Sequence, residues 1–358
     1  MRRWLRRLGT LLLFLLVGLC FAPSLIPPFL DRIYYEGPKS GHFDGKRFFN
    51  PDPGPATALH GGPMRYFNRW LGGSDDRARW PERVTVTPTV PPREVEGEDM
   101  VVTWIGHATV LVQTRSLNIL TDPIWSERAS PFSVIGPKRV RAPGVRFEDL
   151  PKIDLVLVSH NHYDHLDLPT LKRLWDRDRP SIFTGLGNDA ILRKAGIPAR
   201  TLDWGQATHV ADWYLVRAER SHHWSSRWGS DRNRALWSAF TVETPEGKIF
   251  FAGDTGFGDG SWAKEAAAHG PFRLAILPIG AYLPRDVMQA NHMDPDEAVR
   301  VFETLNPRQA LGIHWGTFQL TFEAIDDPPR RLTAALRAHG IAPDRFITTE
   351  VGQSFGVP

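Results

Sequence analysis

The stretch IDLVLVSHNHYDHLDLPTL, residues 153–171, joins an apolar run to a dense group of ionisable side chains. Its opening IDLVLV is rich in branched apolar residues, which predicts a buried strand. His160, His162, Asp164 and His165 follow at once. Side chains two residues apart in an extended segment point to the same side, so His160 and His162 can face one target. Because the other two continue into the turn, we predict that this loop binds a pair of metal ions.

Cys20 is the only cysteine, so no intrachain disulfide can form and no thiolate is available to a metal in the main domain. The ligands must therefore come from His, Asp or Glu. Zinc accepts imidazole and carboxylate donors in a near-tetrahedral shell, and a catalytic zinc keeps one position open for water. One loop cannot complete two such shells. We expect at least one further His and a bridging carboxylate, each at the end of another strand.

Three other predicted strands are followed by a His or an Asp that could serve as such a ligand. KIFFAGDTG places Asp254 just beyond a predicted strand, and ALGIHWGTF does the same for His314. AERSHHWSS offers His222 and His223, and spacing alone does not decide between them. The alternative for Asp254 is a turn cap, and the alternative for His314 is a histidine packed in the core.

The composition is globular: 358 residues, of which 42% are hydrophobic, can form one large domain or two. The formal charge is +3, but four arginines lie in the first seven residues, and without them residues 8–358 carry −1. A nucleic-acid partner is therefore not expected, because clustered Lys and Arg supply most non-specific affinity for phosphates. The basic stretch PKRVRAPGVR, residues 137–146, is interpreted as a solvated loop or as a contact for a single anionic headgroup.

Residues 1–30 are interpreted as a signal peptide or membrane anchor. A cationic start precedes an apolar run over residues 8–22, and prolines follow. At ~1.5 Å per residue this run is shorter than the ~30 Å hydrocarbon core, although extension to residue 26 would make an anchor. We expect a membrane-anchored or periplasmic protein of a bacterial cell envelope, with cleavage after Ala22 as the competing outcome.

Residues 31–98 are rich in Pro, Gly and aromatic residues, which indicates an extension laid over the main domain. The main domain is expected over residues 99–358. There, MVVTWIG and KIFFAGD predict short strands, and DPDEAVRVFETL predicts a helix with Asp294 as N-cap and Glu297 as capping-box partner. A second helix start is predicted at Asp327. This order of elements predicts an α/β fold of two mixed sheets packed together, with helices on the outer faces.

The His-x-His-x-Asp-His loop, followed along the chain by a further His, an Asp and a last His, resembles the metallo-β-lactamase superfamily, whose fold is an αββα sandwich. The resemblance implies zinc, because His162 stands where the di-iron flavoproteins of the superfamily carry Glu. A narrower resemblance covers about residues 100–335. The segments that are similar to the N-acylphosphatidylethanolamine-hydrolysing phospholipase D family are WIGHATVLV, LTDPIWSERASP, GPKR, SHNHYDHLD, AGDTGF, PIGAYLPR, NHMDPDEAVR and IHWGTF.

The family resemblance implies a ligand set for two zinc ions. One ion would be held by His160, His162 and His223, the other by Asp164, His165 and His314, and Asp254 would bridge them. His223 is preferred to His222 because the family ligand directly precedes a Trp, as in HHW. His292 matches a further functionally important His of the family, and catalytic roles are assigned to Asp164 and His292.

Three residues are candidates for orienting the ligands: His107, Asp122 and His222. A metal-binding imidazole usually donates its second N–H to a carboxylate or carbonyl, and Asp122 in LTDP suits that role. The alternatives are a turn-capping Asp122 and a packed His107.

The resemblance implies a dizinc phosphodiesterase that converts N-acylphosphatidylethanolamine-like phospholipids, at a membrane surface, to phosphatidic acid and an N-acylethanolamine. Two zinc ions would lower the pKa of a shared water from about 15.7 to about 7 and neutralise the phosphoryl oxygens. The superfamily loop by itself also allows hydrolysis of a lactone, an amide or a thioester. A third hypothesis is a non-enzymatic scaffold with closed zinc shells. The oligomeric state stays open, with a homodimer as one candidate.

Overall fold

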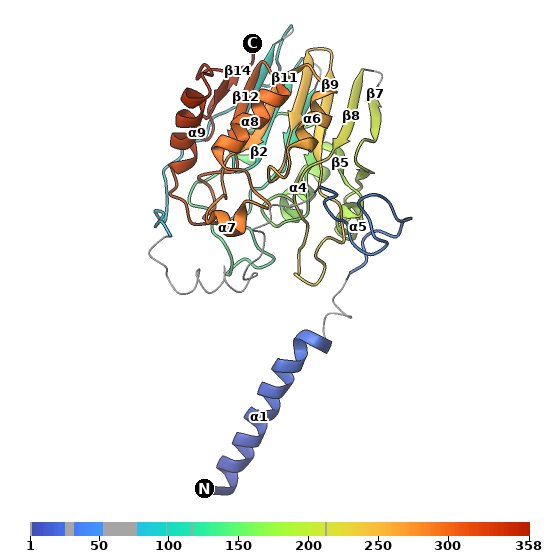
Figure 1. Cartoon of the computed structure of the whole chain (residues 1–358), viewed down its shortest axis with the longest axis vertical. Helices are drawn as coiled ribbons and strands as arrows, with labels where there is room; N and C mark the ends of the chain where they lie inside the picture. Colours follow the sequence, from blue (N-terminus) through green and yellow to red (C-terminus); the bar gives the residue numbers. More distant parts are fainter. Residues whose placement is uncertain (1, 26–31, 53–76, 98, 116, 212) are drawn as a thin grey trace.

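Among the residues that the structure describes, the strands form two seven-stranded sheets that pack face to face (Figure 1). This computed structural model describes residues 2–25, 32–52, 77–97, 99–115, 117–211 and 213–358. Helices cover the outer face of each sheet, so the layers run helix, sheet, sheet, helix. The predicted αββα sandwich is confirmed.

The first sheet contains the strand that leads into the histidine-rich loop, and its order is β14-β1-β2-β3-β4-β5-β6. The bounds are β1 (Met100–Gly106), β2 (Thr109–Thr114), β3 (Asn118–Thr121), β4 (Leu155–Val158), β5 (Ser181–Gly185), β6 (Arg200–Leu202) and β14 (Ser354–Gly356). β1, β2 and β3 form an antiparallel meander, whereas β3 to β6 pair in parallel. The loop after β4 therefore starts at the edge where the parallel strands end.

The second sheet has the order β13-β12-β11-β10-β9-β8-β7. The bounds are β7 (Ala207–Ala211), β8 (Tyr214–Glu219), β9 (Ala239–Thr244), β10 (Gly247–Phe251), β11 (Phe272–Pro278), β12 (Gln309–Ile313) and β13 (Phe346–Ile347). β7 to β10 pair antiparallel, and β10 to β13 pair in parallel. β10 and β12 therefore end at one edge, just before Asp254 and His314.

Alternate residues of the central strands enter two different cores. In β4, Leu155 and Leu157 join the core between the sheets, whereas Val156 and Val158 join the core beneath the outer helices. Successive side chains of a strand point to opposite faces. A strand covered on both faces must be apolar at every position, which explains the unbroken LVLV.

Each main outer helix buries one face. α4 (Leu168–Asp178) and α5 (Asn188–Lys194) cover the first sheet, with Leu171 and Leu192 in its outer core. α6 (Ser261–Ala267), α8 (Pro295–Leu305) and α9 (Asp327–Ala338) cover the second sheet. Short helical turns occur at η1 (Phe147–Asp149) and α7 (Arg285–Met288).

α8 begins with the predicted capping box. Asp294 Oδ1 accepts a 2.9 Å hydrogen bond from Glu297 N, and the Glu297 carboxylate accepts one of 3.1 Å from Asp294 N. The N-cap of α9 is Asp326, one residue before the predicted Asp327. Asp327 is instead the first residue of the helix, and its carboxylate accepts a hydrogen bond from the Tyr282 hydroxyl.

The described parts of the N-terminal extension pack against the sandwich. Phe43 and Phe48 are buried together with Trp237, and Trp80 Nε1 donates a 2.8 Å hydrogen bond to Glu323 O. Residues 53–76 of the predicted extension lie outside the described residues.

α1 (Arg2–Leu25) contains the cationic start and the apolar run of the predicted leader. It stands apart from the sandwich in Figure 1, and Leu11, Phe14 and Leu16 are exposed. Over the described part of the chain we find no helix whose length and apolar character would let it cross a membrane. Residues 26–31, where the predicted leader ends, lie outside the described residues.

Candidate metal centre

The loop after β4, residues 160–166, is called the histidine loop below and folds into a tight turn. His162 O accepts hydrogen bonds from the backbone N–H groups of His165 (3.2 Å) and Leu166 (2.9 Å). His160 Nε2 lies 2.8 Å from His162 Nδ1. His160 and His165 are fully buried, so their ring nitrogens need partners inside the protein.

Asp254 and His314 reach the histidine loop from the second sheet. Asp254 Oδ2 lies 3.2 Å from His165 Nε2 and 3.1 Å from His314 Nε2. The same oxygen lies 3.8 Å from His223 Nε2. Asp254 and His314 therefore face the histidine loop, and not a turn or an apolar core.

The donor atoms fall into groups of the size that a metal ion requires. Within each group, the candidate ligand atoms lie within 4.8 Å of one another. One group comprises His160, His162 and His223, and another comprises His107, Asp164, His165 and His314. A further group joins His223 and Asp254 to His292, whose Nδ1 lies 3.9 Å from Asp254 Oδ2. The structure thus brings every predicted ligand, and His292, into one cluster.

Several buried polar atoms of this cluster form no well-aligned hydrogen bond among the described residues. They are Nε2 of His162, His165 and His223, both ring nitrogens of His314, Oδ1 of Asp254 and Nδ1 of His292. A buried polar group without a partner costs about 1–3 kcal/mol, so this concentration indicates a cation that these atoms share. Imidazole nitrogens and carboxylate oxygens are donors for a transition-metal ion. The cluster therefore fits a bound metal.

Burial and charge divide the histidines into two classes. Burial lowers the pKa of His162 and of His223 to about 3, so both rings are neutral at pH 7 and offer lone pairs. Burial also disfavours the charged form of His314, but Asp254 and Asp164 together outweigh burial and raise the pKa of His314 to about 9. His314 therefore carries a proton at neutral pH unless a cation takes the place of that proton.

Asp164 and Asp254 stay ionised although both are buried. Burial by itself raises the pKa of each carboxyl, but the charge of His165 and the hydrogen bonds from the surrounding histidines together outweigh burial and hold the pKa well below its usual range. Buried carboxylates need compensating positive charge. A divalent cation at the cluster would supply it.

Asp122, a predicted orienting group, connects the histidine loop to the end of β3. Its Oδ2 accepts hydrogen bonds from His165 Nδ1 (2.6 Å) and Ser159 Oγ (2.6 Å), and its Oδ1 accepts one from Ser159 N (2.7 Å). His107, another predicted orienting group, contacts a candidate ligand that is a carboxylate and not a ring, since its Nε2 lies 2.9 Å from Asp164 Oδ2. Sequence reasoning missed Ser159, because a serine beside a histidine carries no specific signal.

The two adjacent histidines that spacing cannot distinguish point to different partners. His223 faces the cluster, and its Nδ1 lies 2.9 Å from Asn291 O. His222 Nδ1 lies 2.6 Å from Asp52 Oδ2 of the N-terminal extension, so the predicted orienting role of the His222 ring is wrong. Asn50 Nδ2 of the extension donates a 2.9 Å hydrogen bond to His223 O. These contacts join residues about 170 positions apart, which no local pattern signals.

Two arginines of the basic stretch 137–146 donate hydrogen bonds to main-chain carbonyls near the site. Arg139 is 5% exposed, and its Nε donates a 3.0 Å hydrogen bond to Ser126 O. Arg141 Nη1 donates to Gly316 O (2.5 Å), close to the end of β12. For Arg139 neither a solvated loop nor a headgroup contact is correct, because main-chain carbonyls occupy its guanidinium donors.

A sandwich with a donor cluster at the shared edge of its sheets is an architecture that metal-dependent hydrolases use, and the comparisons place this chain among them. A family model described as a beta-lactamase superfamily domain matches residues 117–315, and the chain belongs to this superfamily. N-acyl-phosphatidylethanolamine-hydrolyzing phospholipase D 1 of Caenorhabditis elegans is 35% identical over 333 residues, which are 87% of this chain and 92% of that protein. The chain is therefore also a member of the family of that relative. The mitochondrial N-acyl-phosphatidylethanolamine-hydrolyzing phospholipase D of Saccharomyces cerevisiae is 33% identical over 259 residues, 70% of this chain and 55% of that protein.

Solved structures share the fold at low sequence identity. Isothiocyanate hydrolase from Delia radicum gut bacteria is 21% identical, with a TM-score of 0.58 over 72% of this chain and 98% of that one. Igni18, a metallo hydrolase from Ignicoccus hospitalis, is 19% identical, with a TM-score of 0.55 over 73% of this chain and 99% of that one. Identities this low establish the fold alone.

Proposed function

We propose that this chain is a dizinc phosphodiesterase of the phospholipase D kind, which hydrolyses N-acylphosphatidylethanolamine-like phospholipids to phosphatidic acid and an N-acylethanolamine. The observation that carries the proposal is the Asp254 carboxylate, which faces donors from both sheets. The activity in the name of the C. elegans relative supports the substrate class.

In this proposal two zinc ions share the cluster. One would be held by His160, His162 and His223 and the other by Asp164, His165 and His314, with the Asp254 carboxylate available to both. A set made only of imidazole and carboxylate donors suits zinc. When bound, the ions supply Lewis-acid chemistry, because they lower the pKa of water to about 7 and neutralise phosphoryl oxygens.

Asp164 and His292 provide the catalytic contributions of the chain itself. Asp164 keeps its charge 3.3 Å from His165 Nε2, so it can accept a hydrogen bond that orients a water molecule at the cluster. His292 is buried beside Asp254 and can donate a hydrogen bond to the leaving oxygen or to the phosphate. Measuring His292→Ala on a phosphodiester checks this role: unchanged turnover with both ions bound would reject it.

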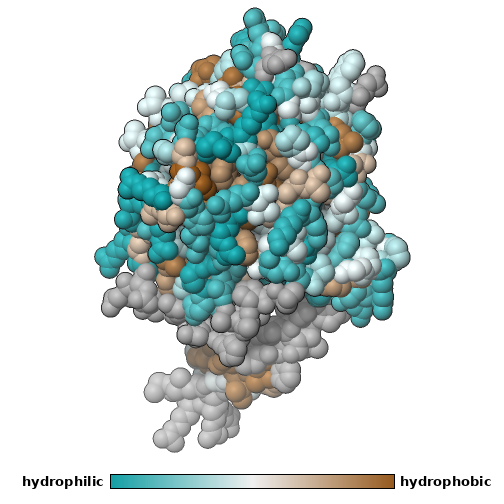
Figure 2. Space-filling view, turned by 45° about the horizontal axis from the view of Figure 1, so that its top comes forward, coloured by the Kyte–Doolittle hydropathy of each residue, from teal (hydrophilic) through white to brown (hydrophobic). Residues whose placement is uncertain are grey.

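The partner in this proposal is a phospholipid at the surface of a membrane in the bacterial cell envelope, with the protein anchored there or periplasmic. Figure 2 displays hydrophilic residues over much of the visible face of the domain, whereas α1 exposes Trp4, Leu12 and Phe14. Apolar and aromatic side chains on a helix with a cationic start suit contact with a lipid surface.

Metal content per chain, combined with analysis of lipid products, tests the proposal. We expect two zinc ions per chain and release of phosphatidic acid. Asp254→Asn should lose metal and lower turnover by more than about 100-fold. The matched control Asp259→Asn changes an exposed carboxylate in the same connection after β10 and should keep both. Turnover of a lactone or a β-lactam, without turnover of a bis-nitrophenyl phosphodiester, would show that the bond is a different one.

A further inference from the structure

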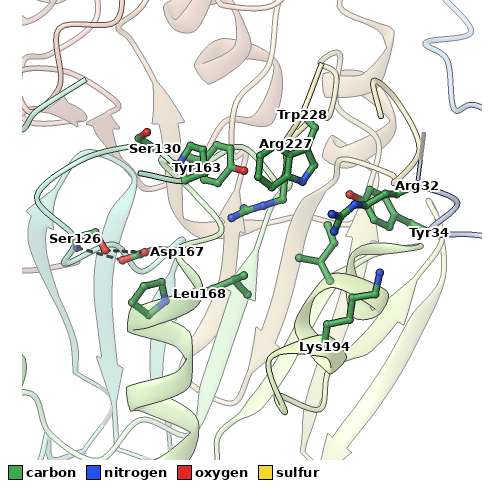
Figure 3. A pocket seen from close by; sticks show the side chains of 13 residues that line it. Arg32, Tyr34, Ser126, Ser130, Tyr163, Asp167, Leu168, Lys194, Arg227 and Trp228 are labelled. Atoms are coloured by element: carbon green, nitrogen blue, oxygen red, sulfur yellow. Dashed lines mark hydrogen bonds between the residues drawn. The ribbon is translucent and has the colours of Figure 1, made fainter. Parts of the chain in front are cut away.

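A largely buried arginine connects the histidine loop to a cavity that the proposed mechanism does not use. The cavity has a volume of about 420 Å³ and lies beside the loop (Figure 3). Tyr163, Arg227 and Trp228 line one part of its wall, and Arg32 and Lys194 line another.

The Arg227 guanidinium reaches the main chain of the histidine loop. Its Nη1 donates hydrogen bonds to Asn161 O (3.0 Å) and to Leu166 O (2.9 Å). These two carbonyls flank the segment 162–165, which carries three of the proposed metal ligands. A single NH₂ group therefore sets the distance between the two ends of that segment.

The middle of the same segment also contacts this guanidinium. The ring centroid of Tyr163 lies 3.9 Å from Arg227 Cζ, within the range of a cation–π interaction. The turn is closed on its inner side by the two hydrogen bonds to His162 O. Arg227 closes it on the other side, so one side chain contacts the start, the middle and the end of the loop.

Arg227 is itself held in position. Its backbone N–H donates a 3.0 Å hydrogen bond to Asp231 Oδ1, and Asp231 Oδ2 accepts one of 2.9 Å from Tyr34 Oη. A guanidinium stays charged at ordinary pH and presents its N–H groups in one plane. Hydrogen bonds from a charged donor are about twice as strong as those between neutral groups. Arg227 is therefore suited to fix the shape of a loop, whereas a flexible ammonium is not.

We propose that Arg227 is a positioning residue, which shapes the histidine loop so that His162, Asp164 and His165 meet the donors delivered by the second sheet. This inference rests on the proposed binding of metal ions by those donors. Metal ligands must be held within about 0.5 Å of their productive geometry. Loss of the guanidinium should therefore weaken metal binding in a domain that is still folded.

Zinc affinity of the full chain, measured by chelator competition, is the direct test. We expect Arg227→Met to bind zinc about 10–100-fold more weakly than the unmodified chain. Arg227→Lys should lie between the two, because one ammonium cannot reproduce the planar bridge between two carbonyls. Guanidinium ion at a non-denaturing concentration should restore part of the affinity of Arg227→Met, since the cavity gives access to the vacated space. Lys194→Met, in the same cavity wall, is the matched control and should keep full affinity.

Circular dichroism and thermal melting of the same samples separate a positioning role from a structural one. A lower melting temperature with unchanged zinc affinity in Arg227→Met or Arg227→Lys would overturn the inference, as would zinc affinity equal to that of the unmodified chain at equal stability. If Arg227→Met does not fold, the affinity of Arg227→Lys decides. Absence of zinc binding in the unmodified chain would reject the proposed function itself, which is a different outcome.

Discussion

Two identical side chains have different roles in this protein because they contact different partners. His222 and His223 are neighbours in the chain, yet one ring meets Asp52 and the other faces Asp254. Trp224 follows them, and its ring centroid lies 4.2 Å from that of His162. The direction of each ring, and not its position in the sequence, therefore separates a candidate ligand from a buried structural histidine.

Substituting the two neighbours separately should give two different defects. His223→Ala should weaken zinc binding by more than about 100-fold, because it removes one donor. His222→Ala should lower the free energy of unfolding by about 1–3 kcal/mol, because the Asp52 carboxylate loses a buried partner. Chelator titration and urea unfolding measure the two effects. An equal loss of metal in both variants would contradict the geometry.

Asp122→Asn should weaken zinc binding by about 10–100-fold. The carboxylate accepts the second N–H of His165 and so fixes which nitrogen of that ring faces the cluster. An amide in its place can present a donor to the same nitrogen and turn the ring. Zinc affinity checks this, with Asp176→Asn on the exposed face of α4 as the control. A wild-type affinity in Asp122→Asn would show that Ser159 and packing orient His165 without it.

A helix or strand can be predicted from the sequence when the contacts that stabilise it are local. The start of α8 is predictable, because Asp294 and Glu297 bond each other's backbone within four residues. β6 and β13 have three residues and two residues, and they are not predicted. Such short strands exist only because a neighbouring strand offers hydrogen bonds, and a neighbour far away in the chain leaves no periodic signal.

Loss of the α8 cap should be measurable as stability. Asp294→Ala should lower the free energy of unfolding by about 1 kcal/mol, because the N–H of Glu297 loses its acceptor. Thr304→Ala, at a half-buried position on the same helix, should change it by less than about 0.5 kcal/mol. Urea denaturation of both variants provides the comparison, and equal effects would assign the cap no role.

In the whole molecule, the apolar cores that stabilise the fold lie apart from the donor cluster. One apolar core lies between the sheets and another lies beneath α4 and α5, and both consist of buried hydrophobic side chains. The donor cluster lies at the edge, where loops from both sheets meet. A fold stabilised in this way does not need a metal ion to bring its layers together.

Metal removal should therefore abolish the activity of the protein without unfolding it. After treatment with a chelator we expect turnover to vanish while the circular dichroism of the sandwich persists. Zinc at 100 times its dissociation constant should then stabilise the fold by about 2.7 kcal/mol for each site that it fills. Thermal melting with and without zinc measures the shift. Unfolding on chelation would instead favour the zinc scaffold.

Much of this architecture is predictable from the chain because its causes are local. The run LVLV, with its branched apolar residues, favours a strand buried on both faces, and the donors of the histidine loop lie within one turn of backbone. Asp254 and His314 are predictable as candidates, because each follows an apolar strand whose end must reach a sheet edge.

The remaining assignments depend on contacts between segments far apart in the chain. That His223 faces the cluster, that Asp52 takes His222, and that Arg227 bridges the histidine loop all follow from how loops of separate elements meet once the sheets have packed. Composition and spacing constrain residues a few positions apart, whereas the direction of a side chain across a packed interface is set by every element that it touches.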